Sequence, residues 1–122
     1  QFQKMAINGN LKAAARDIMG DFAYMRERAI SENTSLLIVF DRSHNRYTVP
    51  NVASPKTPTS FSSDIHITTV NFGGGGTTLT FQTRGTILPT GTNTIILTNS
   101  RGSTATISVL AAGRMFVQYA LH

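Results

Sequence analysis

Apolar residues near the N-terminus recur at alternating intervals of four and three positions, and this spacing constrains the fold more than any other feature. The residues that share it are Leu11, Ala15, Ile18, Phe22, Met25 and Ala29. On an α-helix they form a single narrow seam. We therefore predict one long helix over about residues 3–32, with Arg28 and Glu32 placed for an i,i+4 ion pair. Its start is open: Asn10 caps the helix after a break at Gly9, or the helix runs through both residues.

The hydrophobic pattern of the remaining chain is that of β-strands. Residues 35–41 and 46–50 are β-branched and aromatic runs around the polar stretch 42–45, which is typical of a hairpin. Residues 51–64, rich in Pro, Ser and Thr, are predicted as a loop. Runs with a period of two predict further strands at 65–72, 77–83, 93–99, 104–110 and 114–119. The glycine run 73–76 lies between two of these runs and indicates a flexible hairpin loop.

These elements together predict an α+β fold. Short strands separated by glycine-containing turns favour antiparallel sheet, and the absence of alternating helices argues against a parallel one. No second helix is predicted to cover the apolar seam, so the helix must pack on the sheet. We expect a single domain over 1–122, with a β body at about 35–119. The first helical turns, including Phe2, Met5 and Ile7, project beyond the sheet.

The charge of the chain is unevenly distributed along the sequence. The formal net charge is +5, and every acidic side chain lies within the first 64 residues. Beyond that point the remaining charged side chains are Arg84, Arg101 and Arg114, each beside a glycine at a predicted turn. If these turns converge at one end of a sheet, the three arginines can contact phosphates. The more conservative interpretation is that they serve solubility or subunit contacts.

The sequence offers little support for catalysis or metal binding. There is no cysteine, and His44, His66 and His122 are not spaced as metal ligands. Asp41 and Ser43 beside His44 are the residue types of a catalytic triad, but such triads are normally assembled from distant segments. We therefore expect no enzymatic activity, no metal and no cofactor.

Both ends of the chain resemble a known family. Within residues 2–33, the matching positions are Phe2, Met5, Asn10, Leu11, Ala14, Ala15, Ile18, Phe22, Arg26, Ala29, Ile30 and Asn33. Downstream, residues 79–87 and 93–115 follow a pattern of strand, glycine turn, strand and a Gly-Arg ending. In this order the segments resemble the GspH/FimT family of minor pseudopilins, which are type IV pilin-like proteins.

This resemblance implies a structural role. The protein would be a minor pilin or pseudopilin, acting as a structural, priming or tip subunit of a type IV pilus or of a type II secretion pseudopilus. Its partners would be other pilins. Family members carry a leader and an apolar segment before the region that matches here, so we expect this chain to follow such an inner-membrane anchor and to lie in the periplasm. The resemblance does not distinguish a subunit of a pilus from a subunit of a secretion system.

The alternative that the resemblance raises is a FimT-like minor pilin that binds double-stranded DNA during uptake. In such members a second basic residue follows the Gly-Arg pair two positions on. Here Gly113 and Arg114 are kept, but Phe116 occupies the second basic position. A further departure is Arg28, which stands where the family usually has an acid. The candidate phosphate contacts remain Arg84, Arg101 and Arg114.

Overall fold

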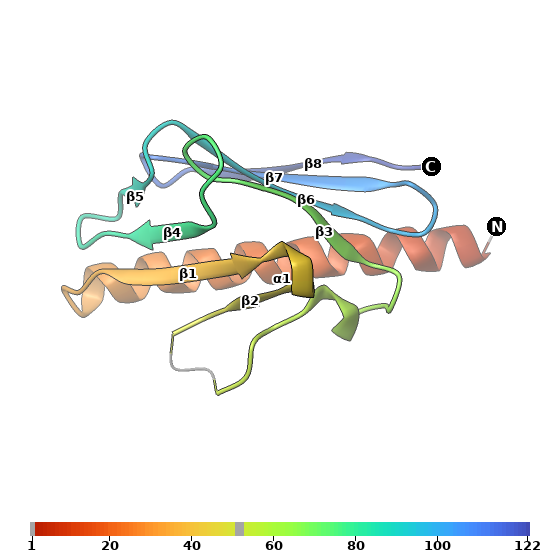
Figure 1. The fold of residues 1–122 in the computed structure, drawn as a ribbon, viewed down its shortest axis with the longest axis horizontal. Helices are drawn as coiled ribbons and strands as arrows, with labels where there is room; N and C mark the ends of the chain where they lie inside the picture. The colour runs from red at the N-terminus through yellow and green to blue at the C-terminus, as the bar shows by residue number, and fades with distance from the viewer. Residues whose placement is uncertain (1, 51–52) are drawn as a thin grey trace.

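The computed structural model describes residues 2–50 and 53–122, in which one long helix lies along two antiparallel sheets (Figure 1). Helix α1 spans Phe2–Ser31 and passes through Gly9 and Asn10 without a break. The predicted α+β class, with a long N-terminal helix packed on antiparallel sheet, is therefore confirmed. Of the two possible helix starts, the continuous helix is the one observed.

The strands form two four-stranded sheets of different order. The first sheet has the order β2–β1–β4–β5, and its strands are β1 (Leu36–Asp41), β2 (Arg46–Thr48), β4 (Thr78–Phe81) and β5 (Ile87–Leu88). The second has the order β3–β6–β7–β8, and its strands are β3 (His66–Asn71), β6 (Thr92–Thr98), β7 (Thr104–Leu110) and β8 (Met115–Ala120). All neighbouring strands are antiparallel.

The predicted hairpin around residues 42–45 is present as the β1–β2 pair. The prediction for the glycine run was wrong in one respect. Gly76 N donates to Phe72 O over 2.7 Å, which closes a tight turn, but β3 before it and β4 after it pair with β6 and β1 respectively. The run therefore carries the chain from the second sheet to the first. Strand alternation indicates which residues are buried but not which strand is the partner, and this is why the pairing was missed.

All six residues of the apolar seam are buried, with exposed fractions of 0–1%. Phe22 is central, since its ring lies 6.0 Å from that of Phe40 and 5.8 Å from that of Phe81, measured between centroids. Both aromatic partners belong to the first sheet, whereas Ile95 and Ile107 contribute the second sheet to the same buried cluster. A single helix face thus closes the core against both sheets.

A polar cluster fixes the loop after β2 to the helix. The Lys56 ammonium lies 2.8 Å from a carboxylate oxygen of Asp17 and 2.8 Å from one of Asp21. Tyr47 donates its hydroxyl to Asp21 over 2.7 Å, and burial together with that carboxylate raises the pKa of Tyr47. The two acids are one helical turn apart on α1, so a single lysine can contact both.

A second polar cluster joins the start of β3 to the β6–β7 turn. The Asp64 carboxylate accepts hydrogen bonds from the Ser62 hydroxyl and from both the backbone N–H (2.9 Å) and the hydroxyl (2.8 Å) of Ser100. These donors favour the charged carboxylate, and they lower the pKa of Asp64 to about 2.

Replacing Phe22 by alanine should cost about 3–5 kcal/mol of unfolding free energy, because the ring is fully buried between two other aromatic rings. Urea denaturation measures this loss. The matched control is Tyr24→Ala on the same helix, whose side chain is 60% exposed and whose removal should change stability by about 0.5 kcal/mol or less. Equal losses in the two variants would show that the seam does not face the core.

Asp64→Asn should alter the acid branch of the stability curve. The folded-state pKa of Asp64 lies below its ordinary value of 3.8, so the charged form stabilises the fold above that value and loses this effect as the pH falls toward 2. The melting temperature of wild type should therefore exceed that of Asp64→Asn at neutral pH, and the difference should shrink between pH 4 and 2. A difference that is constant over this range would contradict the assignment.

Candidate assembly surface and basic turns

The front of α1, residues 3–6, lies at the end of the helix that carries the N-terminus (Figure 1), and its side chains are exposed. Met5 is 70% exposed, the largest exposed fraction among the exposed large hydrophobic side chains of the described residues. A shallow hollow of about 360 Å³ starts on this part of the helix and extends past Asn8 toward the residues that follow β8, and it is lined by Lys4, Met5, Asn8, Gly9, Lys12 and Leu121. Its mixture of apolar and basic groups suits contact with another protein surface.

Asn8 marks the boundary between the exposed front and the docked part of the helix. Its amide oxygen accepts a hydrogen bond from the Asn99 side chain over 3.0 Å, and its amide nitrogen donates to the His122 carbonyl over 3.2 Å. The Asn99 amide oxygen accepts in turn from the backbone N–H groups of Arg101 and Ser103, each over 3.0 Å. Asn8 is only 6% exposed. Behind it the apolar seam begins, and ahead of it α1 is mostly exposed.

Arg26 anchors the other end of the helix to two turns of the β body. Its Nε donates to the Gly85 carbonyl over 2.7 Å. A Cβ atom on Gly113 would lie 2.5 Å from the same Nε and 2.7 Å from the Gly85 carbonyl oxygen, so the two turns enclose the guanidinium closely. A backbone hydrogen bond of 2.8 Å from Ile87 N to Ala111 O also joins these turns.

The arrangement of these turns separates one of the three candidate arginines from the other two. Arg84 directly precedes Gly85 and Arg114 directly follows Gly113, the two glycines that lie against Arg26. Both arginines are exposed at that end of the molecule. Arg101 lies in the β6–β7 turn, at the opposite end of β7, where its Nε donates to the His122 carbonyl over 2.8 Å. The condition that all three turns converge is therefore not met, because successive turns of an antiparallel sheet alternate between its two ends.

Sequence reasoning assigned no role to Asn8 or Arg26, although both stand in register with the apolar seam. Asn8 lies three residues before Leu11, and Arg26 lies four residues after Phe22. Polar residues at these helical spacings face the edge of the buried stripe, where they can reach backbone groups of the sheets. The helical spacing of Asn8 and Arg26 from the apolar seam was therefore the feature of the sequence that could have indicated their contacts with the sheets.

The remaining candidate groups are exposed, apart from Asp41, which is partly buried. Asp41, Ser43 and His44 do interact, but the Asp41 carboxylate and the Ser43 hydroxyl both approach the same ring nitrogen of His44, at 2.8 and 3.2 Å. A triad needs the acid and the hydroxyl on opposite ring nitrogens, so this cluster is a capped 3-10 turn.

Within residues 2–50 and 53–122, no group of three His, Asp or Glu side chains is placed to hold a metal ion. The predicted ion pair is confirmed, with Arg28 Nε 2.8 Å from the Glu32 carboxylate.

No helix in the described part of the chain combines the length and the hydropathy that a membrane crossing requires.

A family model and two solved structures are similar to this chain. The model of a family described as type II transport protein GspH matches residues 14–113. Two crystal structures of the type IV minor pilin FimU from Pseudomonas aeruginosa strain PAO1 are similar to this chain. One has a TM-score of 0.67 at 19% identity, covering 91% of this chain and 90% of that one. The other has a TM-score of 0.63 at 18% identity, with coverages of 88% and 92%. At such identities the likeness establishes a shared fold. A search of curated protein sequences found no match.

Gly113→Ala should destabilise the protein more than Gly91→Ala. Both glycines have positive φ, +97° and +91°, so both substitutions carry about 1–2 kcal/mol of backbone strain. A Cβ at Gly91 meets nothing within 4 Å, whereas one at Gly113 meets Arg26 and the Gly85 carbonyl. We expect Gly113→Ala to cost at least about 1 kcal/mol more in urea denaturation. Equal costs would mean that the turns do not enclose Arg26.

Proposed function

Because this chain belongs to the GspH family of type II transport proteins, we propose that it is a minor pilin or pseudopilin that joins other pilins through the front of α1. The family and the fold are structural rather than enzymatic. The machine it serves is a type IV pilus or a type II secretion pseudopilus, where it acts as a priming or tip subunit. A segment preceding this domain would anchor it in the inner membrane, with the domain itself in the periplasm.

The observation that carries this proposal is the division of α1 at Asn8. Behind Asn8 the helix is committed to its own sheets through the apolar seam. Ahead of it, Gln3, Lys4, Met5 and Ala6 are exposed although they belong to the same continuous helix. An isolated helical extension gains little stability of its own in water, so these turns are best accounted for as a surface that other subunits cover.

Single-cysteine crosslinking in assembled filaments tests this surface. The chain has no cysteine, so Met5→Cys and Tyr24→Cys each introduce one thiol. The two native side chains are similarly exposed, at 70% and 60%, on the front and on the docked part of α1. With a short maleimide–diazirine reagent, which attaches to the introduced thiol and whose photoactivated end inserts into any nearby group, Met5→Cys should crosslink to other pilins and Tyr24→Cys should do so at least about tenfold less. Equal yields, or none at Met5→Cys, would contradict assembly through the front of the helix.

A second candidate function, weak binding of double-stranded DNA, is favoured by one observation. The turns against Arg26 bring Arg84 and Arg114 to the same end of the molecule, and no carboxylate follows Asp64 in the sequence. Phosphate contacts from two arginines would be independent of base sequence, since the phosphate groups are the same at every base pair. The affinity would be low because few counterions are released.

The salt dependence of a gel shift tests this alternative. Two phosphate contacts predict a log–log slope near −2, and Arg114→Ala should bring it close to −1. Arg101→Ala is the control, because Arg101 lies at the opposite end and should leave the slope unchanged. No shift with micromolar wild type at about 50 mM salt would rule out the DNA function and leave the assembly role as it stands.

A further inference from the structure

Both edges of the first sheet are covered by hydrogen bonds from elsewhere in the chain. At β2, Tyr47 exchanges two backbone bonds with Lys56, each of 2.8 Å. At β5, which is only two residues long, Ile87 N donates to Ala111 O over 2.8 Å. Covering or shortening an edge in this way prevents another chain from pairing with it.

The β3 edge of the second sheet is also protected. The Asn45 side chain behaves as a short piece of strand, donating to the Ile65 carbonyl over 2.9 Å and accepting from Ile67 N over 2.7 Å. The register of β3 against β6 shifts just after Ile67, which bends the strand. At its other end Phe72 bonds Gly76 in both directions.

The β8 edge is different, because its outward backbone groups have no hydrogen-bond partner within residues 2–50 and 53–122. Leu110 N donates to Arg114 O over 2.8 Å, which places the even-numbered residues of β7 in bonded positions toward β8. Their partners in the register are Phe116, Gln118 and Ala120. Bonded and non-bonded pairs alternate in an antiparallel ladder. The N–H and C=O groups that face away are therefore those of Met115, Val117 and Tyr119, and no group among the described residues hydrogen-bonds to them.

The composition of β8 adds no protection. The strand reads MFVQYA, without a charge, a proline or a glycine, and it pairs with β7 along its whole length without a register shift. Charged residues, prolines and bulges are the usual devices that keep an edge strand from pairing. Among the four sheet edges in the described structure, β8 is the one that presents a run of free donors and acceptors.

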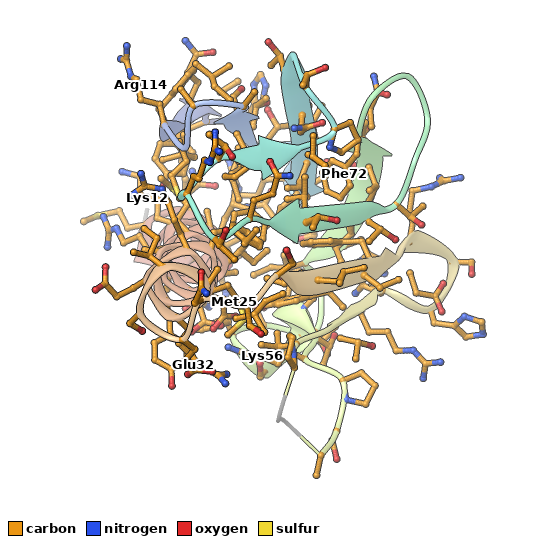
Figure 2. All side chains as sticks on the ribbon, turned by 90° about the vertical axis from the view of Figure 1, so that its left-hand side faces the viewer. Lys12, Met25, Glu32, Lys56, Phe72 and Arg114 are labelled. Carbon is orange, nitrogen blue, oxygen red and sulfur yellow. The ribbon has the colours of Figure 1, made fainter. Side chains whose placement is uncertain are left out.

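The borders of this edge are basic. On α1, the Lys12 ammonium lies 5.6 Å from the centroid of the Tyr119 ring, and exposed Arg16 follows one helical turn later. Arg114, also exposed, directly precedes the strand. Lys12 and Arg114 lie on the same side of the molecule (Figure 2). A segment paired with β8 would thus lie beside positive charge on the helix side.

We propose that the free edge of β8 binds an extended acidic segment of another protein by strand addition. Alternate side chains of an added strand point to opposite faces. Those on the helix side would face Lys12 and Arg16 and are therefore acidic, while those on the outer face would lie beside Phe116, which is 39% exposed, and are therefore apolar. The three free backbone positions match a segment of about five to seven residues.

A second copy of this chain is not the occupant. Pairing β8 with the β8 of another copy would bring together two borders that carry Lys12 and Arg114, and β8 itself contains no acid to balance them. The proposal uses the edge of the second sheet, whereas the assembly role uses the front of α1 around Met5. If strand addition at β8 fails its test, the assembly role of the front of α1 is unaffected, and the reverse also holds.

Amide hydrogen exchange with a synthetic probe tests the proposal. The probe is an acetylated peptide of alternating glutamate and valine. In the free protein, the amides of Met115, Val117 and Tyr119 should exchange at least about tenfold faster than that of Gln118, and saturating peptide should slow them at least about tenfold. A peptide with lysine in place of glutamate should have no such effect. Slow exchange of the three amides in the free protein would overturn the proposal.

Val117→Pro and Val117→Ala form the matched pair of variants. Proline at 117 removes an N–H that faces away from β7, so the sheet is kept, whereas alanine keeps the N–H. By fluorescence anisotropy, Val117→Pro should bind the peptide at least about tenfold more weakly than wild type, and Val117→Ala about as well. If Val117→Pro fails to fold, a peptide N-methylated at its valines makes the same test on wild type. Unchanged binding, or binding of duplex DNA but not of the peptide, would contradict strand addition.

Discussion

Burial of the apolar seam of α1 is the interaction on which the rest of the structure depends. Phe22 packs between Phe40 and Phe81 of the first sheet, and the same helix face contacts the buried isoleucines of the second. The two sheets of the described structure have no strand in common, and one helix face completes the core of both. At about 25 cal/mol per Å² of apolar surface, this shared burial is the principal source of stability.

Polar contacts at the two ends of the seam define where the helix is docked. Arg26 is enclosed by the turns at Gly85 and Gly113, and Asn8 bonds Asn99 at the other end. Between these anchors one face of α1 is buried against the two sheets. On the N-terminal side of Asn8, residues 3–6 are exposed. The same anchors determine the surfaces available to partners. They bring Arg84 and Arg114 to one end, and they leave the front turns, with Met5, at the other.

The helix and most strands could be predicted because their patterns are local. The four-three spacing specifies which face of α1 is buried, and the alternation in residues 93–99 and 104–110 specifies the buried faces of β6 and β7. Pairing is not local, and so the crossing of the chain between sheets at the glycine run 73–76 was not predicted. The same applies to the arginines: each was placed on a turn correctly, but only the order of strands shows that Arg101 is separated from Arg84 and Arg114. The hydrogen-bonding state of the β8 edge likewise depends on a register that no sequence pattern reports.

The most direct test of the central claim is oxidative footprinting of the methionines in purified filaments and in the isolated domain. Met5 and Met25 differ in exposure, at 70% and 0%, so their rates of sulfoxide formation report the two parts of α1 separately. If other subunits cover the front of the helix, Met5 should oxidise readily in the isolated domain and at least about tenfold more slowly in the filament, with Met25 slow in both. Equally fast oxidation of Met5 in the filament would contradict assembly through this surface.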